Sequence, residues 1–318
     1  MAMRVLLVTS EGACGIAEHS AYLKEAVEAA DPSIEVELIP VLHPHAITNR
    51  LASSGPAADL VWLNYHAALH SQWTPEYIRT VRTKVPVGVT WHDTGVPNSD
   101  HCTSIHAVAD AFVVHEPAED LPGAIYWRQG VPARKGCWQY EWQRWPVLGS
   151  VGFPFGWKNF DLLAEATATT GWSLHLIAPN ATHEQITGWI ARNPRLSVEA
   201  GFLPRDAVVS QLSGCDATAF VYHCHNTGTS GAIRQGIAAR KPLIASEYPF
   251  CRQNRDLWLN ELGRRAITWV EPNYQALVGA LSRVRIAPLD AGMVALAAQD
   301  SWMKLGHRYA KLYKDLCG

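Results

Sequence analysis

Residues 217–246 read ATAFVYHCHNTGTSGAIRQGIAARKPLIAS, and this stretch decides the fold. The apolar run at 217–222 predicts a buried strand, residues 230–240 have the spacing of a helix, and the apolar run at 242–246 predicts the next strand. A polar, glycine-containing loop at 223–229 joins the first strand to the helix. A strand, a loop, a helix and a second strand in this order form the repeating unit of a parallel sheet wrapped by helices.

The same alternation extends through the rest of the chain. Further strands are expected at residues 4–9, 36–41, 60–65, 87–91, 111–114, 147–152, 174–178, 196–202 and 266–270. Further helices are expected at residues 16–30, 159–170, 183–192, 206–212, 254–262, 274–284 and 292–316. The strands are continuously apolar, which is typical of parallel strands covered on both faces. The pattern therefore predicts an α/β protein with two successive doubly wound, Rossmann-like domains.

Length and composition agree with two globular domains. The chain has 318 residues, of which 48% are hydrophobic and 18% charged, and either half is long enough to bury a core. The start has no secretory-signal pattern, and no apolar run is long enough to span a membrane. The seven cysteines are scattered without a C-x-x-C pair, so we expect reduced thiols in a cytoplasmic protein.

Charge is distributed unevenly between the two halves. Residues 1–146 contain 10 Lys and Arg against 16 Asp and Glu, a net charge of −6. Residues 147–318 contain 17 against 13, a net charge of +4. A phosphate-bearing ligand is therefore expected on the second half. The acidic first half is a poor surface for a nucleic-acid backbone, which needs several Lys or Arg contacts.

We place the connection between the domains in the Trp-rich stretch at 137–146, where strand-like runs are interrupted. Its rings are expected to pack between the domains, and stacking on a sugar is the alternative. The predicted division is an acceptor-side domain at 1–146, a nucleotide-sugar-binding domain at 147–300 and a C-terminal helix at 301–318 that packs back on the first domain.

Ligands of open parallel sheets bind in the loops at the carboxyl ends of the strands. The loop after 217–222 contains Gly228, Thr229, Ser230 and Gly231, where a helix begins. Backbone N–H groups and the helix dipole favour an anion there, although Thr229 or Ser230 would also serve as an ordinary helix cap. Lys158 follows the first strand of the second half and can neutralise phosphate oxygens.

Two loops of the first half qualify in the same way. His92 and Asp93 follow the strand at 87–91, where a histidine can hydrogen-bond a sugar hydroxyl and its neighbouring acid can orient it. The pair would alternatively cap the loop. The glycine-containing loop at 12–15 lacks a complete G-x-G-x-x-G pattern and is expected to line the cleft. For the run His223-Cys224-His225 we favour a satisfied strand end over a metal cluster, and we assign no metal ligands.

The order of these segments resembles the retaining GT-B glycosyltransferases that include glycogen synthase-like and bacterial mannosyltransferase-like enzymes. Residues 15–20 resemble the first loop and helix of that family, and residues 89–93 resemble its "t-x-H-D" strand exit. Residues 149–166 are similar to its "G-x-x-x-x-K-G" unit, in which Lys158 matches the phosphate-binding lysine. Residues 230–245 are similar to "S-G-x-x-x-E-A-l-a-x-G-k-P-V-I-a", and residues 301–313 to the helix that crosses back to the first domain.

Three positions depart from the family pattern. The family arginine before the lysine falls at or near Phe153, its E-x(7)-E carboxylates fall on Thr227 and Gln235, and its turn glycine is Arg240. Gln235 can still hydrogen-bond ribose hydroxyls, more weakly because it is neutral.

The resemblance implies a two-domain GT-B fold with a cleft, and transfer of a sugar from a nucleoside-diphosphate sugar to an acceptor, with retention and without a metal ion or a further cofactor. We expect His92, Asp93 and Lys158 to take part in the reaction. The positions expected to bind the donor are Gly15, Gly152, Phe153, His225, Thr227, Gly228, Thr229, Ser230, Gly231 and Gln235. The acceptor would be a glycan, a small molecule or modified DNA. The alternatives are a GT-B protein that binds a nucleotide or glycan without catalysis, a glucosyltransferase of modified DNA bases, and a nucleotide-sugar epimerase.

Overall fold

The computed structural model describes residues 2–11, 14–40, 45–52, 58–66, 70, 72–92, 100–115, 121–134, 136, 145–223, 230–286 and 289–318. The sequence predictions for Asp93, His225, Thr227, Gly228 and Thr229, and for the Trp-rich stretch at 137–144, lie outside these residues. The chain divides into two compact units. Among the described residues, unit 1 contains 2–130 and 300–318, and unit 2 contains 131–223 and 230–299.

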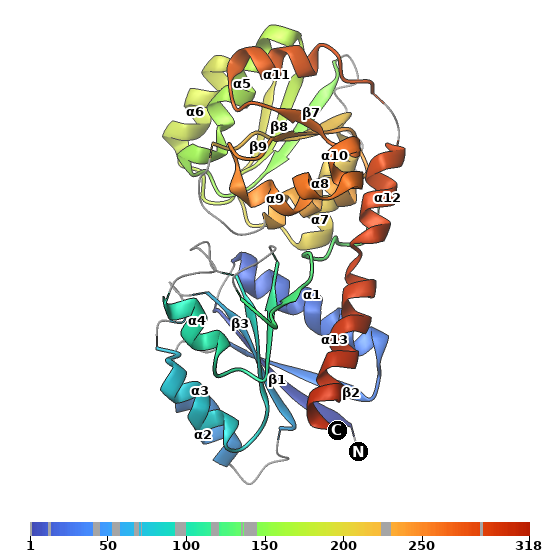
Figure 1. Cartoon of the computed structure of the whole chain (residues 1–318). Helices are drawn as coiled ribbons and strands as arrows, with labels where there is room; N and C mark the ends of the chain where they lie inside the picture. The colour runs from blue at the N-terminus through green and yellow to red at the C-terminus, as the bar shows by residue number, and fades with distance from the viewer. Residues whose placement is uncertain are drawn as a thin grey trace. The chain divides into compact units, whose positions relative to one another are not determined.

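Unit 1 is built on a parallel sheet with the strand order β2-β1-β3-β4-β5-β6 (Figure 1). Its elements in chain order are β1 (Met3–Thr9), α1 (Gly15–Ala30), β2 (Ile34–Pro40), α2 (His45–Ala52), β3 (Leu60–Tyr65), α3 (Pro75–Arg82), β4 (Val87–Trp91), α4 (Asp100–His106), β5 (Ala111–Val114), β6 (Ile125–Tyr126) and α13 (Trp302–Cys317).

Both faces of this sheet are buried, as the continuous apolar runs predicted. Along β1, Val5 and Leu7 pack with α1 and α13, while Leu6 and Val8 pack with α2, α3 and α4. Successive side chains of a strand point to opposite faces, so one apolar strand supplies two cores. Figure 1 shows α1 and α13 on one side of the sheet and the other three helices on the opposite side.

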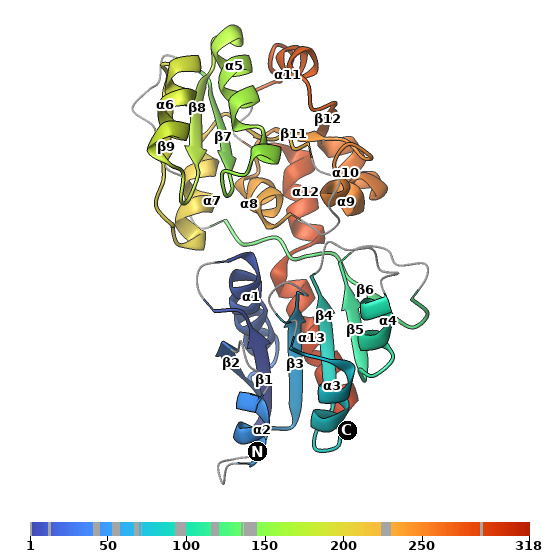
Figure 2. The same ribbon diagram turned by 90° about the vertical axis from the view of Figure 1, so that its left-hand side faces the viewer.

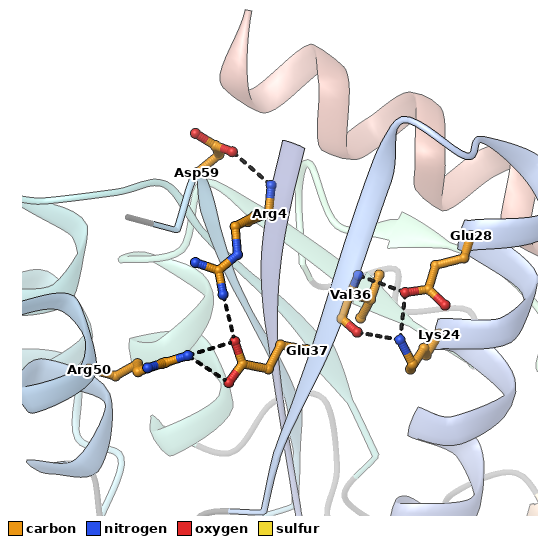
Figure 3. A network of polar contacts seen from close by, with 7 residues as sticks. All are labelled: Arg4, Lys24, Glu28, Val36, Glu37, Arg50 and Asp59. Atoms are coloured by element: carbon orange, nitrogen blue, oxygen red, sulfur yellow. Dashed lines mark hydrogen bonds and ion pairs between the residues drawn. The ribbon is translucent and has the colours of Figure 1, made fainter. Parts of the chain in front are cut away.

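The edge strand β2 is held by charged side chains of α1 (Figure 3). Lys24 donates to the carbonyl of Val36, and the carboxylate of Glu28 accepts from the Val36 amide. These contacts satisfy backbone groups that an edge strand would otherwise expose for pairing with another chain. Glu37, also on β2, forms ion pairs with Arg4 and Arg50.

The final helix α13 packs closely against α1. A Cβ atom added at Gly306 would lie 2.3 Å from the carbonyl oxygen of Ala26, so only glycine fits at this crossing. Farther along α13, the hydroxyl of Tyr309 lies 2.9 Å from that of Thr90 on β4. The predicted return of the C-terminal helix to the first sheet is confirmed by these contacts.

Unit 2 contains a second six-stranded sheet, ordered β12-β11-β10-β7-β8-β9, with every described pairing parallel. Its elements are β7 (Val147–Val151), η1 (Gly156–Lys158), α5 (Phe160–Thr170), β8 (Ser173–Ile177), α6 (His183–Arg192), β9 (Leu196–Glu199), α7 (Arg205–Gly214), β10 (Ala217–Phe220), α8 (Gly231–Ala239), β11 (Leu243–Ser246), η2 (Arg252–Asn254), α9 (Arg255–Leu259), α10 (Glu261–Ala266), β12 (Thr268–Val270), α11 (Tyr274–Leu281) and α12 (Ala291–Gln299).

Helices cover both faces of this sheet as well. Residues of α7, α8 and α12 share one core with Phe220 and Leu243, while residues of α5, α6 and α11 share another with Ala219 and Ile244. Figures 1 and 2 show these two groups of helices on opposite sides of the strands. Two doubly wound domains, the fold class expected from the sequence, are therefore confirmed.

Several predicted elements have other limits in the structure, among them the following three. The single helix expected at 292–316 is two helices, because the side chain of Ser301 accepts from the Lys304 amide and starts α13 anew. Similarly, Asn260 ends α9 and caps α10, which divides the helix expected at 254–262. The strand expected at 196–202 ends at Glu199, and Phe202 beyond it is exposed. No described helix is long and apolar enough to cross a membrane.

Candidate functional site

The strand order of unit 2 locates its ligand-binding edge. In the sheet, β8 and β9 lie on one side of β7, and β10, β11 and β12 lie on its other side. The order reverses between β7 and β10, and ligands of doubly wound sheets bind at such a switch point, beyond the carboxyl ends of the strands. The loop after β7 contains Gly152, Phe153 and Lys158, and the chain after β10 leads to Ser230 at the start of α8.

Lys158 lies at this edge as a buried cation. Its side chain is 6% exposed, and its ammonium nitrogen lies 3.8 Å from the ring centre of Tyr222 and 4.3 Å from that of Trp157. The negative faces of the two rings attract the ammonium and partly replace its lost hydration. A lysine that only served solubility would extend into water, so its enclosed position favours a role in binding.

Gly152 allows the lysine to take this position. Its φ of +150° is disfavoured for residues with a side chain, and a Cβ atom there would lie 3.3 Å from Cε and 3.4 Å from Nζ of Lys158. The loop therefore requires glycine both for its backbone and for the space that the lysine occupies. Phe153, the residue in place of the family arginine, is half-buried and lies near Phe155.

The start of α8 lies on the other side of the switch point. Ser230 is its N-cap residue and is 5% exposed, but its hydroxyl makes no capping hydrogen bond. Gly231, the first helical residue, is exposed. The first-turn amides of a helix have no intrahelical partners and are available to an anion. Ordinary side-chain capping of this end by Ser230, the alternative considered from sequence, is absent.

The body of α8 is fixed by buried polar residues. Arg234 forms an ion pair with Asp256 of α9, and both side chains are buried. The next residue, Gln235, is also buried. At the far end, Arg240 has the left-handed conformation with φ 58°, which explains why the resembling family has glycine there.

In unit 1, the loop after β1 leads directly into α1. Gly15 is the first residue of this helix, and among the described residues no further group lies within 4 Å of the position that its Cβ atom would occupy. Packing against the described residues therefore does not require glycine there.

His92 follows β4 immediately and is part of a group of histidines. Its ring lies edge-on to that of His19 on α1, with centroids 4.4 Å apart, and 5.1 Å from that of His115, which follows β5. Burial, and secondarily the nearby His19, holds the pKa of His92 well below its ordinary value. Burial has the same effect on the pKa of His19, with a smaller contribution from His115.

The rings of His19 and His92 have ring nitrogens without a hydrogen-bond partner in the described part of the chain. Among the described residues, neither ring nitrogen of His19 has one, and Nε2 of His92 also lacks one. An unsatisfied buried polar atom costs about 1–3 kcal/mol, so a bound group that satisfied these nitrogens would be favoured. One nitrogen from each of His19, His92 and His115 lies within 4.8 Å of the others.

Sequence reasoning identified His92 and missed the other two histidines as members of a site. A usable signal was the position of His115, which follows β5 as His92 follows β4, at the carboxyl edge of the same sheet. His19 gives no comparable signal, because a histidine within a helix is an ordinary feature.

Comparison with known proteins gives the fold. No protein-family model matches the sequence, and no curated protein matches it. Among solved structures, Anabaena HepE in complex with UDP and glucose is similar, with a TM-score of 0.69 and 12% identity over 99% of this chain and 100% of that one. The apo form of the lipopolysaccharide outer core galactosyltransferase WaaB has a TM-score of 0.64 and 15% identity, over 98% and 100% of the chains.

A third similar structure is AviGT4, a glycosyltransferase involved in avilamycin A biosynthesis, with a TM-score of 0.59 and 15% identity over 99% of this chain and 98% of that one. These likenesses extend over nearly the whole length of each chain. At such low identity they establish the architecture alone, and the predicted two-domain GT-B fold is confirmed.

Proposed function

We propose that the chain is a glycosyltransferase that moves a sugar from a nucleoside-diphosphate sugar to an acceptor, with retention and without a metal ion in the transfer step. The observation that carries the proposal is the enclosed ammonium of Lys158 at the switch point of unit 2. A diphosphate leaving group develops negative charge as the sugar departs, and a fixed cation stabilises that charge. The similar solved structures, several of which are sugar transferases by name, support the same class.

The start of α8 supplies the second group for the diphosphate. Gly231 is exposed and the Ser230 side chain does not cap the helix, so the positive end of the helix dipole favours an anion there. We assign Ser230, Gly231 and the preceding His225, Thr227, Gly228 and Thr229 to donor binding, with Gly15, Gly152 and Phe153 bordering the donor. Gln235 is assigned to the ribose hydroxyls, where a neutral amide replaces the family carboxylate.

His92 is assigned to the sugar or the acceptor. Its low pKa keeps the ring uncharged near neutral pH, so it can accept or donate a hydrogen bond to a hydroxyl without attracting an anion. Asp93 would orient it. The donor's own phosphate would take the acceptor proton on the same face of the sugar, so no protein nucleophile is required. The acceptor is assigned to the class of glycans and small molecules with a free hydroxyl.

The first test identifies the donor. A thermal-shift screen with UDP, GDP, ADP and TDP and their sugars reveals the base, because a ligand that binds only the folded state raises the unfolding temperature. Release of nucleoside diphosphate from the selected donor then measures turnover. Retention is checked by the anomeric configuration of the product in its NMR spectrum.

The second test changes Lys158. Lys158→Ala is expected to lower kcat by about 10²–10³-fold, the effect of removing one charge-stabilising group from a transition state. Lys241→Ala is the matched control, because this lysine follows the opposite end of α8. Near-normal turnover by a folded Lys158→Ala variant would remove Lys158 from the mechanism.

A second candidate function is binding of a nucleotide or glycan without catalysis. The observation that favours it is Gln235, a neutral residue buried on α8 where the resembling family has a carboxylate. Thermal stabilisation by a nucleotide sugar without any release of nucleoside diphosphate would select this candidate over the transferase.

A further inference from the structure

Three parts of unit 1 that are distant in sequence bring histidine rings together. Trp91 of β4 pairs with Val114 of β5, so His92 and His115 are the next residues on neighbouring strands at the same level of the sheet. His19 reaches them from α1, and the three ring centroids lie 4.4–5.1 Å apart. His19 and His115 are buried, at 2% and 3% exposure.

The hydrogen bonding of His115 resembles that of a metal-binding histidine. Its Nδ1 lies 2.8 Å from the carbonyl oxygen of Trp127. A carbonyl only accepts, so Nδ1 carries the hydrogen, and in the neutral ring Nε2 then carries the lone pair. Donation of one ring N–H to a backbone carbonyl is the usual way in which a metal-binding histidine is oriented.

The other two rings are available to a ligand in the same way. Both nitrogens of His19 and the Nε2 of His92 have no hydrogen-bond partner within the described part of the chain. A ring nitrogen with an unused lone pair is what a metal ion requires of an imidazole. Trp302 packs edge-on against His19 at 4.8 Å and adds an apolar wall.

We propose that His19, His92 and His115 bind one divalent transition-metal ion, with Zn²⁺ as the preferred metal and a fourth position left for water or another ligand. Three imidazoles with one open position form a known zinc arrangement. The group contains no carboxylate, and Mg²⁺ and Ca²⁺ prefer oxygen ligands, so those ions do not fit. In tetrahedral zinc sites the Zn–N distances are about 2.0–2.1 Å, which places two ligand nitrogens about 3.4 Å apart. The three histidine nitrogens now lie within 4.8 Å of one another. The rings must therefore rotate inward to bind the ion.

The site does not depend on sugar transfer, because binding is measured without donor or acceptor. It does have a consequence for the proposed function. An ion on His92 occupies a ring nitrogen that a hydroxyl of the sugar or acceptor would otherwise contact, so the two ligands compete for that residue.

The experiment uses the full-length, tag-free protein, stripped with EDTA and then dialysed against excess ZnCl₂ and finally against metal-free buffer. Elemental analysis is expected to find about one zinc ion per chain. ZnCl₂ is also expected to raise the unfolding temperature, and CoCl₂ to give the visible absorption of a tetrahedral nitrogen site. The proposal is overturned if the protein retains no zinc, shows no thermal shift with ZnCl₂ and gives no cobalt absorption.

Variants then assign the ligands. His19→Ala and His115→Ala are each expected to weaken zinc binding at least 10–100-fold, by analogy with losses seen when even supporting groups of metal sites are removed. His307→Ala is the matched control, because His307 is exposed on α13 of the same unit. Equal zinc binding by His19→Ala and wild type, or equal loss in His307→Ala, contradicts the assignment. Circular dichroism of the metal-free variants checks folding, and if either variant is unfolded the wild-type zinc and cobalt measurements decide.

Discussion

The buried ion pair between Arg234 and Asp256 gives a prediction whose size follows from the structure. The two side chains are 2% and 0% exposed. Asp256→Ala removes the carboxylate and leaves the guanidinium in the interior, where it cannot lose its charge. Breaking a buried pair in this way costs about 3–5 kcal/mol, because the guanidinium loses its buried carboxylate partner. For a domain of this size the loss corresponds to a fall of about 6–20 °C in Tm.

Hydrogen exchange places the effect on the helix concerned. Arg234 lies on α8, whose start is proposed to bind the diphosphate. If α8 depends on the pair, its amides should exchange roughly 10²- to 4 × 10³-fold faster in Asp256→Ala, since each 1.4 kcal/mol is about a factor of ten. Mass spectrometry of the peptide covering residues 231–239, together with urea unfolding, measures both quantities.

Two comparisons make the result decisive. The double variant Arg234→Met, Asp256→Ala removes the buried guanidinium charge as well and should be more stable than Asp256→Ala by at least about 1 kcal/mol. Glu261→Ala breaks the pair with Arg265, whose side chains are 65% and 76% exposed, and should cost no more than about 1 kcal/mol. The reasoning is refuted if Asp256→Ala costs as little as Glu261→Ala, or if the double variant is the least stable of all.

The remaining predictions concern packing, backbone conformation and pH. Gly306→Val should destabilise unit 1 by at least about 1–3 kcal/mol, because its side chain would overlap the backbone of Ala26; urea unfolding checks this. Arg240→Gly should stabilise unit 2 by about 1 kcal/mol by relieving its left-handed conformation, seen as a higher Tm. Burial lowers the pKa of His175, and this effect is partly offset by Gln211 and Glu199. As the pH falls, His175 is therefore protonated in the unfolded chain before it is protonated in the folded one. The free energy of unfolding should decrease as the pH drops below about 6.5. His175→Gln should lose less stability between pH 7.5 and 5 than wild type.

Much of the fold was predictable because parallel strands are apolar on both faces. The strands at 60–65, 87–91 and 111–114 and the helix at 183–192 were predicted with the limits that the structure has. Periodicity did not predict the division of the last helix, because apolar spacing continues across the break and only the capping side chain of Ser301 marks it. The expected start of a separate helix at 301 came from the family resemblance. Apolar periodicity detects the buried face of a helix. When two successive helices each have a buried face, it does not detect the change of direction between them.

The candidate site was predictable where sequence order and spatial order coincide. Lys158 and Ser230 each lie just after a strand or at the start of the following helix, so topology alone brings them to one edge of the second sheet. The enclosure of Lys158 by Trp157 and Tyr222 was not predictable, since it depends on how two loops fold. The histidine group of unit 1 required the register of β4 with β5 and the position of α1, which no local pattern contains.

The two units differ in the charge that their sheet edges present, and this difference bears on which one would bind the diphosphate of the proposed donor. At the carboxyl edge of unit 1, burial keeps His19 and His92 uncharged, so these rings offer lone pairs and N–H groups but no fixed cation. At the corresponding edge of unit 2, Lys158 and the start of α8, which the Ser230 side chain does not cap, provide positive charge. The net charges agree with this difference, since residues 1–146 carry −6 and residues 147–318 carry +4. An anionic group is therefore favoured on unit 2, and hydroxyl groups or a metal ion, which need lone pairs, are favoured on unit 1.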